Sequence, residues 1–334
     1  MNQMHPPMRP PLTLSVAPMM DWTDRHCRFF HRMMSKNAQL YTEMVTAVAI
    51  VHGDLERLLA YDAAEHPLIL QLGGSDPTLL ALAVRRAAPY GYDGFNLNVG
   101  CPSDRVQSGA FGAVLMEKPD LVVELISAMM HATDRPVSVK CRIGIDDQTP
   151  AEVLPAFLEK LQKAGLQEVI IHARKAWLKG LSPKENREIP PLDYALVHQM
   201  KAAFPKMRIS INGGVNTLTH AKELLDAGLD GVMIGRAAYH DPSAVLIGAD
   251  ALWGDQAGPD AFGVIDAMRP YIARHLAEGG RLNQITRHML GLFSGRPGAR
   301  AWRRILSENM TKPEAGLALL DQAVEPLLLA LPEN

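Results

Sequence analysis

The residues best placed to do chemistry follow a short alternating segment and form the run Asn98-Val99-Gly100-Cys101-Pro102. Over residues 95–99, apolar and amide side chains alternate, which is the two-residue period typical of a strand. The Gly-Cys-Pro step then turns the chain away from that strand. We therefore predict that Cys101 lies on a stiff, accessible loop at a strand end. Its flanking residues disfavour the alternative of a buried apolar cysteine, which we expect instead for Cys27 and Cys141.

Polar residues and glycines also stand where other strands are expected to end. Two turns, Asn212-Gly213-Gly214 and Gly235-Arg236, follow the seventh and eighth predicted strands, which is the usual phosphate site of a barrel. Glycines let backbone N–H groups approach a phosphate closely, and Arg236 adds charge. The sequence therefore indicates a mononucleotide phosphate at this end.

Two further residues favour a flavin. A lysine inside a barrel is costly unless it meets an anion, and Lys140 suits a ring that becomes negative on reduction. Gln71 can both donate to and accept from the same ring. These residues suit FMN better than NAD, because no GxGxxG run follows an early strand. His172, with Arg174 after it, is expected to contact the ligand, whereas Glu43 is either a structural partner for an interior cation or a substrate contact.

Eight short apolar segments with helical patterns between them position these residues. We predict strands over 12–20, 39–45, 67–73, 94–99, 136–143, 168–173, 208–212 and 231–235. Asp76-Pro77 should cap one helix, Thr149 and Glu152 should form a capping box on another, and Gly228 should end a third. Strand and helix alternating eight times predict an α/β fold, a (β/α)8 TIM barrel.

The predicted strands separate apolar from polar side chains. Val137, Val139 and Cys141 share one face, and Ser138, Lys140 and Arg142 share the other. The segments 169–174 and 209–212 show the same separation. Since helices cover the outside of a barrel, we expect the polar faces to point into the lumen near the carboxyl ends of the strands.

From about residue 260 the strand signals stop and amphipathic helices are predicted over 266–278, 283–293, 299–310 and 313–330. Six arginines and no acidic residue lie between Arg281 and Leu306. Arg300 and Arg303 share one side of a helix, with Trp302 expected in the core. The arginines form either a phosphate-binding surface or an ordinary solvated helix face. The chain thus divides into a flexible tail (1–11), a barrel (12–250) and a helical domain (260–334).

Composition limits the remaining choices. The chain has 334 residues, a net charge of -2 and three cysteines without a CxxC pair. These values give no global attraction to nucleic acid and predict a reducing, cytoplasmic setting without disulfides or a metal site. The proline-rich start has no apolar core long enough for a signal peptide or membrane span, so we expect neither there. We expect a monomer.

Motifs in order along the chain resemble those of the bacterial tRNA-dihydrouridine synthases, A subfamily. They are APMMDWTD (17–24), LYTEMV (40–45), LQLGG (70–74), NLNVGCPSDRVQSGAFGAVLM (96–116), VKCRIGID (139–146), IHARKAWLKGLSPKENREIPPLDY (171–194), INGG (211–214), GRAAYHDP (235–242) and GLFSGRPGARAWRRILSEN (291–309). The resemblance implies an FMN enzyme that uses NADPH to reduce the C5–C6 bond of D-loop uridine in tRNA, at positions 20 and 20a.

The resemblance also implies residue roles. Cys101 corresponds to the proton donor, and Asn98 to a residue contacting the target uridine. Lys184, Arg187, Arg300 and Arg303 correspond to positions that orient the tRNA. The implied FMN site comprises Pro18, Met19, Met20, Gln71, Lys140, His172, Asn212, Gly213, Gly214, Gly235 and Arg236.

Two alternatives remain open. A flavin dehydrogenase acting on free pyrimidines would explain the barrel but leave the arginine-rich helices without a role. An RNA-binding protein with an inactive barrel would explain those helices and would purify without colour.

Overall fold

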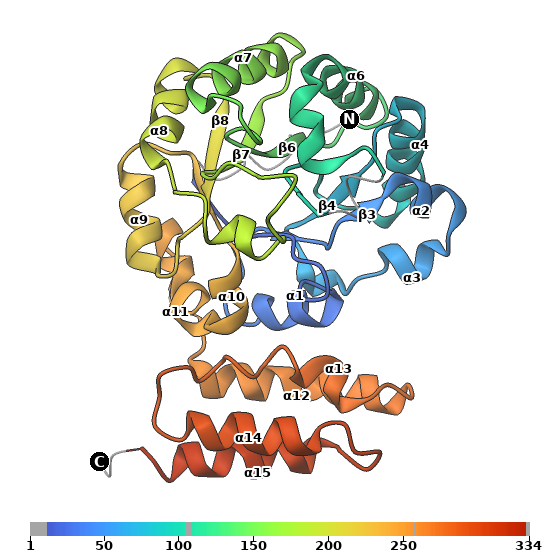
Figure 1. Ribbon diagram of the computed structural model, residues 1–334. Coiled ribbons are helices and arrows are strands. Elements are labelled where there is room, and N and C mark those ends of the chain that lie inside the picture. Colours follow the sequence, from blue (N-terminus) through green and yellow to red (C-terminus); the bar gives the residue numbers. More distant parts are fainter. Residues whose placement is uncertain (1–11, 104–108, 257, 332–334) are drawn as a thin grey trace, which may run out of the picture.

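Parallel strands form the core of the computed structural model, which describes residues 12–103, 109–256 and 258–331. The predicted tail, 1–11, therefore lies outside the described residues. The sheet order is β1-β9-β8-β7-β6-β5-β4-β2, with β3 paired to β4. A bridge between Ser15 and Gln39 joins the two ends, so the sheet closes and the predicted (β/α)8 barrel is confirmed (Figure 1). The strands are β1 (Thr13–Val16), β2 (Leu40–Tyr41), β3 (Val45–Thr46), β4 (Leu68–Gly73), β5 (Gly94–Val99), β6 (Val137–Arg142), β7 (Glu168–His172), β8 (Arg208–Asn212) and β9 (Gly231–Ile234).

Two predicted strands differ from the observed ones. The second is divided into β2 and β3, because the side-chain oxygen of Thr42 accepts the Gln71 N–H at 3.1 Å in place of a ladder carbonyl. The first ends at Val16 rather than at Met20. Beyond it, Met19 and Thr23 bond to each other in a turn, and Asp21 has a φ of 64°. Both changes leave irregular backbone at the barrel mouth.

The helices that surround the barrel begin and end largely at the predicted residues. Asp76 caps its helix by accepting the Leu79 N–H at 2.9 Å, and Gly228, with a φ of 99°, ends another. The predicted capping box at Thr149 is wrong, because its carbonyl rather than its hydroxyl accepts the Glu152 N–H. The helices are α1 (Arg25–Arg32), α2 (Ala47–His52), α3 (Leu55–Leu59), α4 (Pro77–Ala87), α6 (Pro119–Met130), α7 (Pro150–Lys163), α8 (Tyr194–Ala203), α9 (Leu218–Asp226), α10 (Arg236–His240) and α11 (Pro242–Leu246).

The two faces of the strands divide as predicted. Val139, Cys141, Val169 and Ile171 pack outward in the main apolar core under the helices. A separate small apolar layer fills part of the lumen and consists of Ala17, Tyr41, Ile69, Ile170 and Met233. The polar positions between these residues are therefore left to face the lumen.

The C-terminal helices form a separate lobe beneath the barrel in Figure 1, comprising α12 (Ala261–Ala277), α13 (Leu282–Thr286), α14 (Ala299–Asn309) and α15 (Leu317–Leu328). The helix predicted over 283–293 is wrong beyond Thr286. There Gly291 lies against the barrel, where a Cβ would come within 2.4 Å of the His240 carbonyl oxygen. Trp302 is fully buried and donates to the Met289 carbonyl at 3.3 Å, which confirms its core position.

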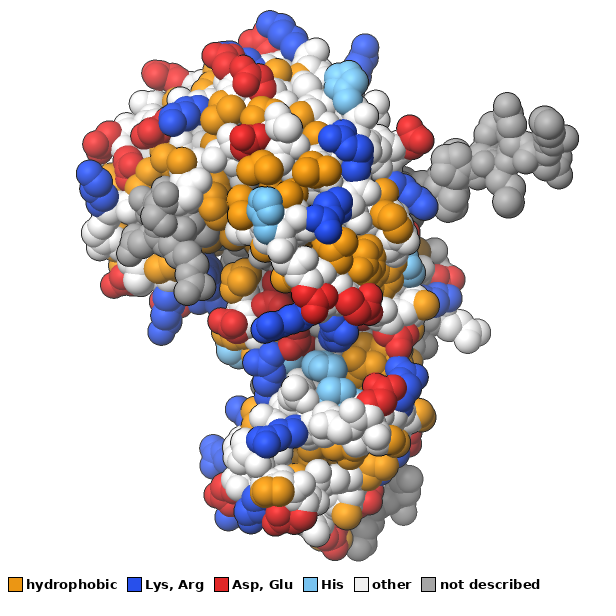
Figure 2. All heavy atoms as spheres, turned by 90° about the vertical axis from the view of Figure 1, so that its right-hand side faces the viewer, with side chains coloured by type: hydrophobic (Ala, Val, Ile, Leu, Met, Phe, Trp, Pro, Cys, Tyr) orange, Lys and Arg blue, Asp and Glu red, His pale blue; other side chains and the backbone are white. Residues whose placement is uncertain are grey.

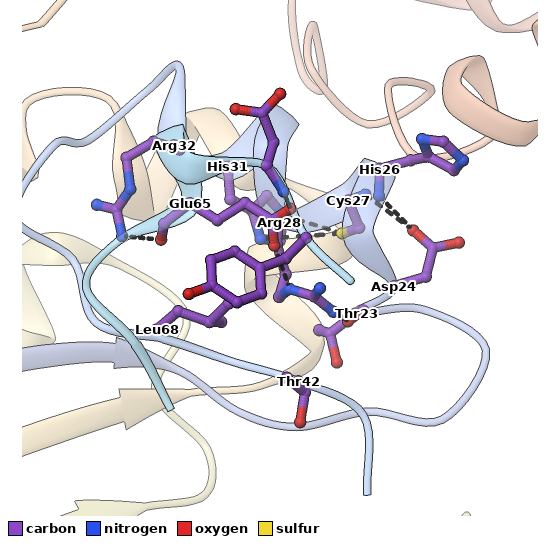
Figure 3. Close-up of polar contacts among 12 residues, drawn as sticks. Thr23, Asp24, His26, Cys27, Arg28, His31, Arg32, Thr42, Glu65 and Leu68 are labelled. Atoms are coloured by element: carbon purple, nitrogen blue, oxygen red, sulfur yellow. Dashed lines mark hydrogen bonds and ion pairs between the residues drawn. The ribbon is translucent and has the colours of Figure 1, made fainter. Parts of the chain in front are cut away.

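Asp24 joins the barrel to the helical lobe. Its carboxylate caps α1 through the His26 and Cys27 N–H groups at 2.9 Å (Figure 3) and pairs with Arg287 at 2.6 Å. His288 lies 3.1 Å away. Burial opposes the charge of Asp24, but these hydrogen bonds outweigh it and hold the pKa of Asp24 well below its usual range. The lobe is thus anchored by a partly buried negative charge.

Within the described residues, none of the helices combines the length and hydrophobicity needed to cross a lipid bilayer.

Asp24→Asn should lower the free energy of unfolding by about 1–3 kcal/mol at pH 7, since asparagine keeps the cap but loses the charge that binds Arg287 and His288. Because the pKa of Asp24 is lowered in the folded protein, its charge stabilises the fold above the unfolded carboxyl pKa of about 3.9. This stabilisation is lost as the pH falls below that value. The difference between the two proteins should therefore shrink between pH 5 and pH 2. Denaturant titrations that show a pH-independent difference would contradict this assignment.

A cationic cavity at the barrel mouth

A cavity of about 580 Å³ opens at the carboxyl ends of the strands. The predicted cofactor residues all line it: Pro18, Met19, Met20, Gln71, Lys140, His172, Asn212, Gly213, Gly214, Gly235 and Arg236. Asn98, Cys101 and Arg187 also line it. Lys184, Arg300 and Arg303 do not, and their side chains are exposed elsewhere.

A chain of amides along β4 and β5 fixes the cavity floor. Gln71 Nε2 donates to Asn96 Oδ1 at 2.8 Å, and Asn98 Nδ2 donates to Gln71 Oε1 at 3.0 Å. Asn98 Oδ1 then accepts the N–H groups of Gly100 and Cys101, at 3.2 and 3.0 Å. The alternating amides of β5 therefore hold the turn that carries Cys101.

Cys101 differs from the other two cysteines in its access to the cavity. It is half-buried, with its Sγ 3.5 Å from Ser103 Oγ, whereas Cys27 and Cys141 are fully buried. Burial raises the pKa of the Cys141 thiol to about 12, which suits an inert packing residue. The structure therefore confirms the predicted accessibility of Cys101 and the predicted burial of Cys27 and Cys141.

Arg142 connects the turn after β5 to the segment between β7 and α8, a role that sequence reasoning missed. Its Nε donates to the Gly100 carbonyl at 3.2 Å, next to Cys101. Its Nη1 donates to the carbonyls of Lys175 and Asn186, at 3.0 and 2.8 Å. Arg142 follows Lys140 by two residues on β6, so both side chains lie on the same face of the strand. This spacing was the sequence signal that could have indicated a role for Arg142 at the cavity. The acceptors are backbone atoms from distant segments, which a pattern of side chains does not reveal.

Positive charge dominates the cavity wall. Among the described lining residues, Asp21 carries the single carboxylate. The cationic side chains in the lining are those of Lys140, Arg142, Arg174, Arg187 and Arg236. Burial, together with the neighbouring Arg142 guanidinium, lowers the pKa of Lys140 to about 8. Burial and the same two cations hold the pKa of His172 well below its usual value, so its ring is neutral at pH 7. A wall of this charge favours an anionic ligand.

The turn after β8 brings backbone close to the cavity. Gly213 has a φ of 110°, and a Cβ there would lie 2.7 Å from His172 Cδ2. Gly214 has a φ of 74°, and its Cβ would lie 2.5 Å from Leu192 Cδ1. Both conformation and space therefore require glycine, and the lack of a side chain lets the backbone approach a ligand closely.

Glu43 lies outside this cavity. Its Oε1 accepts the Asp21 N–H at 2.5 Å, and burial raises its pKa. Of the two roles considered for it, the contact favours a structural one, although its partner is a backbone N–H rather than an interior cation. Within the described residues, no cluster of three or more His, Cys, Asp or Glu side chains could hold a metal ion.

A parallel barrel with a cationic cavity at its open end and an accessible thiol beside it is the arrangement expected of a barrel enzyme. The family model for dihydrouridine synthase matches residues 15–328. The tRNA-dihydrouridine(20/20a) synthase of Shewanella oneidensis is 57% identical over 314 residues, covering 94% of this chain and 93% of that protein. Those of Vibrio vulnificus and Salmonella typhimurium are 55% and 54% identical over 93% and 95% of this chain, and over 95% of each relative. The chain belongs to the dihydrouridine synthase family.

One thiol per folded chain should react with an aromatic disulfide reagent, because Cys101 alone of the three cysteines lines a cavity. The Cys101→Ser variant should show no fast reaction, and all three thiols should react in denaturant. A fast phase that survives in Cys101→Ser would show that Cys27 or Cys141 is accessible.

Proposed function

We propose that the protein reduces uridine to dihydrouridine at positions 20 and 20a of tRNA. Its family membership and its identity to relatives of that activity support the assignment. The observation that carries it is the position of Cys101 on the wall of a cationic cavity at the barrel mouth. That arrangement places an acid and an anion-binding surface around one space.

FMN is the proposed cofactor, and the cavity fits it. The wall offers Lys140 without a described carboxylate partner, and it offers the glycine turn after β8 beside Arg236 for a phosphate. When bound and reduced by NADPH, the flavin supplies the hydride that C6 of uracil receives. Lys140 would stabilise the negative charge of the reduced ring, and Gln71, held by Asn96 and Asn98, would present a fixed amide to it.

Cys101 is the proposed proton donor to C5 of uracil. Its position depends on Asn98 and Arg142, which bond to the N–H and the carbonyl of the Gly100–Cys101 peptide directly before the sulfur. Asn98 also lines the cavity and is proposed to contact the uracil ring. This fixed geometry lowers the barrier by holding the acid close to the carbon that accepts its proton.

The helical lobe is proposed to bind tRNA. Arg300 and Arg303 are exposed on α14, while Lys184 and Arg187 belong to the segment between β7 and α8 that borders the mouth. Moving a uridine out of its stack costs a few kcal/mol, which phosphate contacts can offset. Recognition would rest on the shape and backbone of a folded RNA.

Incubation with NADPH and tRNA that lacks dihydrouridine should produce dihydrouridine at positions 20 and 20a, measured by mapping the modified nucleotides. Cys101→Ala should retain tRNA binding and lose about 10²–10⁴-fold in rate, the usual contribution of a positioned acid. Reduction of free uracil at a comparable rate would instead favour an enzyme of free pyrimidines. Full activity of Cys101→Ala would exclude its role as the acid.

Arg300→Ala combined with Arg303→Ala should weaken tRNA binding and reduce its salt dependence. Each lost phosphate contact should make the slope of log binding constant against log salt less negative by about 0.7–0.9. Binding isotherms at several salt concentrations test this. An unchanged slope would mean that this face of α14 is simply solvated.

A further inference from the structure

A second hollow, of about 380 Å³, lies where the barrel meets the helical lobe. Residues of α1, α3 and α13 line it, so it exists only because the two parts of the chain dock together. Figure 2 shows Lys, Arg, Asp, Glu and His side chains gathered where the barrel meets the helical lobe. We call this hollow the junction pocket, and the residues of its wall used below are Asp24, Arg25, Arg28, Glu43, Arg57 and Arg287.

Two of the four arginines in the junction pocket are committed to carboxylates. Arg28 pairs with the buried Glu65 at 2.5 Å (Figure 3), and Arg287 pairs with Asp24 at 2.6 Å. Arg25 and Arg57 form no ion pair with a described carboxylate, and Arg25 donates to the Arg57 carbonyl at 3.2 Å, which brings the two residues together. The remaining carboxylate of the pocket, Glu43, already accepts the Asp21 N–H. Two guanidinium groups are therefore left to face an anion.

The junction pocket and the cavity at the barrel mouth are lined by neighbouring residues of the same two chain segments. Asp21 and Trp22 line the cavity, while Asp24 and Arg25, two or three residues further on, line the junction pocket. Met44 and its neighbour Glu43 are divided in the same way. A polynucleotide with one base in the cavity would therefore pass close to the junction pocket with an adjacent phosphate.

We propose that the junction pocket binds a backbone phosphate of the tRNA next to the nucleotide in the cavity, through Arg25 and Arg57. This proposal rests on the proposed function and adds a contact point to it. Arg287, fixed by Asp24, contributes positive charge at the same place. The pocket would thus fix the register of the RNA relative to the barrel, because it forms only in the docked arrangement of the two parts.

Arg25→Ala combined with Arg57→Ala should weaken tRNA binding and make the salt slope less negative by about 0.7, the value for one single-strand phosphate contact. Reduction of the enzyme by NADPH without tRNA should be unchanged, because neither residue lines the cavity. Arg135→Ala is the matched control: it removes an exposed arginine just before β6, at the opposite end of the barrel, and should behave like the wild type. Arg25→Lys with Arg57→Lys should restore most of the slope, which a purely structural role would not explain.

The outcomes separate the two proposals. A wild type that reduces tRNA, with a double alanine variant that matches Arg135→Ala in affinity and slope, would overturn the junction pocket alone. A wild type that neither binds nor reduces tRNA would overturn both. Inorganic phosphate binding that the double variant loses, with tRNA binding unchanged, would assign the pocket to a free anion and overturn its role in RNA binding. The single variant Arg57→Ala, at an exposed position, repeats the test should the double variant be unstable.

Discussion

Buried positive charge without a matching carboxylate is the constraint on which the barrel mouth depends. Lys140 is held with a lowered pKa by its burial beside Arg142, and His172 stays neutral because it is buried and both cations face it. Such a cluster is costly unless an anion completes it. Arg142 offsets part of the cost by donating to three backbone carbonyls, and these same bonds position the turn of Cys101. The charge of the cavity wall and the placement of Cys101 therefore depend on the same residue.

The contacts between the barrel and the helical lobe fix the orientation of the lobe. Asp24 caps α1 with one oxygen and binds Arg287 with the other, so the orientation of the lobe is tied to the loop that follows β1. Tyr271 of α12 stacks on Phe29 of α1 with ring centroids 3.9 Å apart, which adds an apolar contact to the ionic one. A surface on the lobe is thereby held in register with a cavity in the barrel.

Alternating side chains predicted the strands and the direction of the polar faces, because period-two patterning is a local property. The division of the second strand was missed, since it depends on Thr42 accepting a hydrogen bond from Gln71 in the next strand. The end of α13 was missed because Gly291 packs against His240, a contact across the domain joint. The strand-end residues of the cavity were predicted, whereas Arg142 and the junction pocket depend on backbone acceptors and on residues brought together from α1, α3 and α13. Long-range contacts of this kind have no local signal.

We propose that the cationic cavity holds a flavin mononucleotide against Lys140. Native mass spectrometry of the purified protein, combined with its visible absorption spectrum, tests this most directly. We expect one FMN per chain in the wild type and a weakened or absent FMN complex in Lys140→Met. A colourless wild type that takes up no FMN when titrated, or a Lys140→Met variant with unaltered FMN affinity and spectrum, would contradict it.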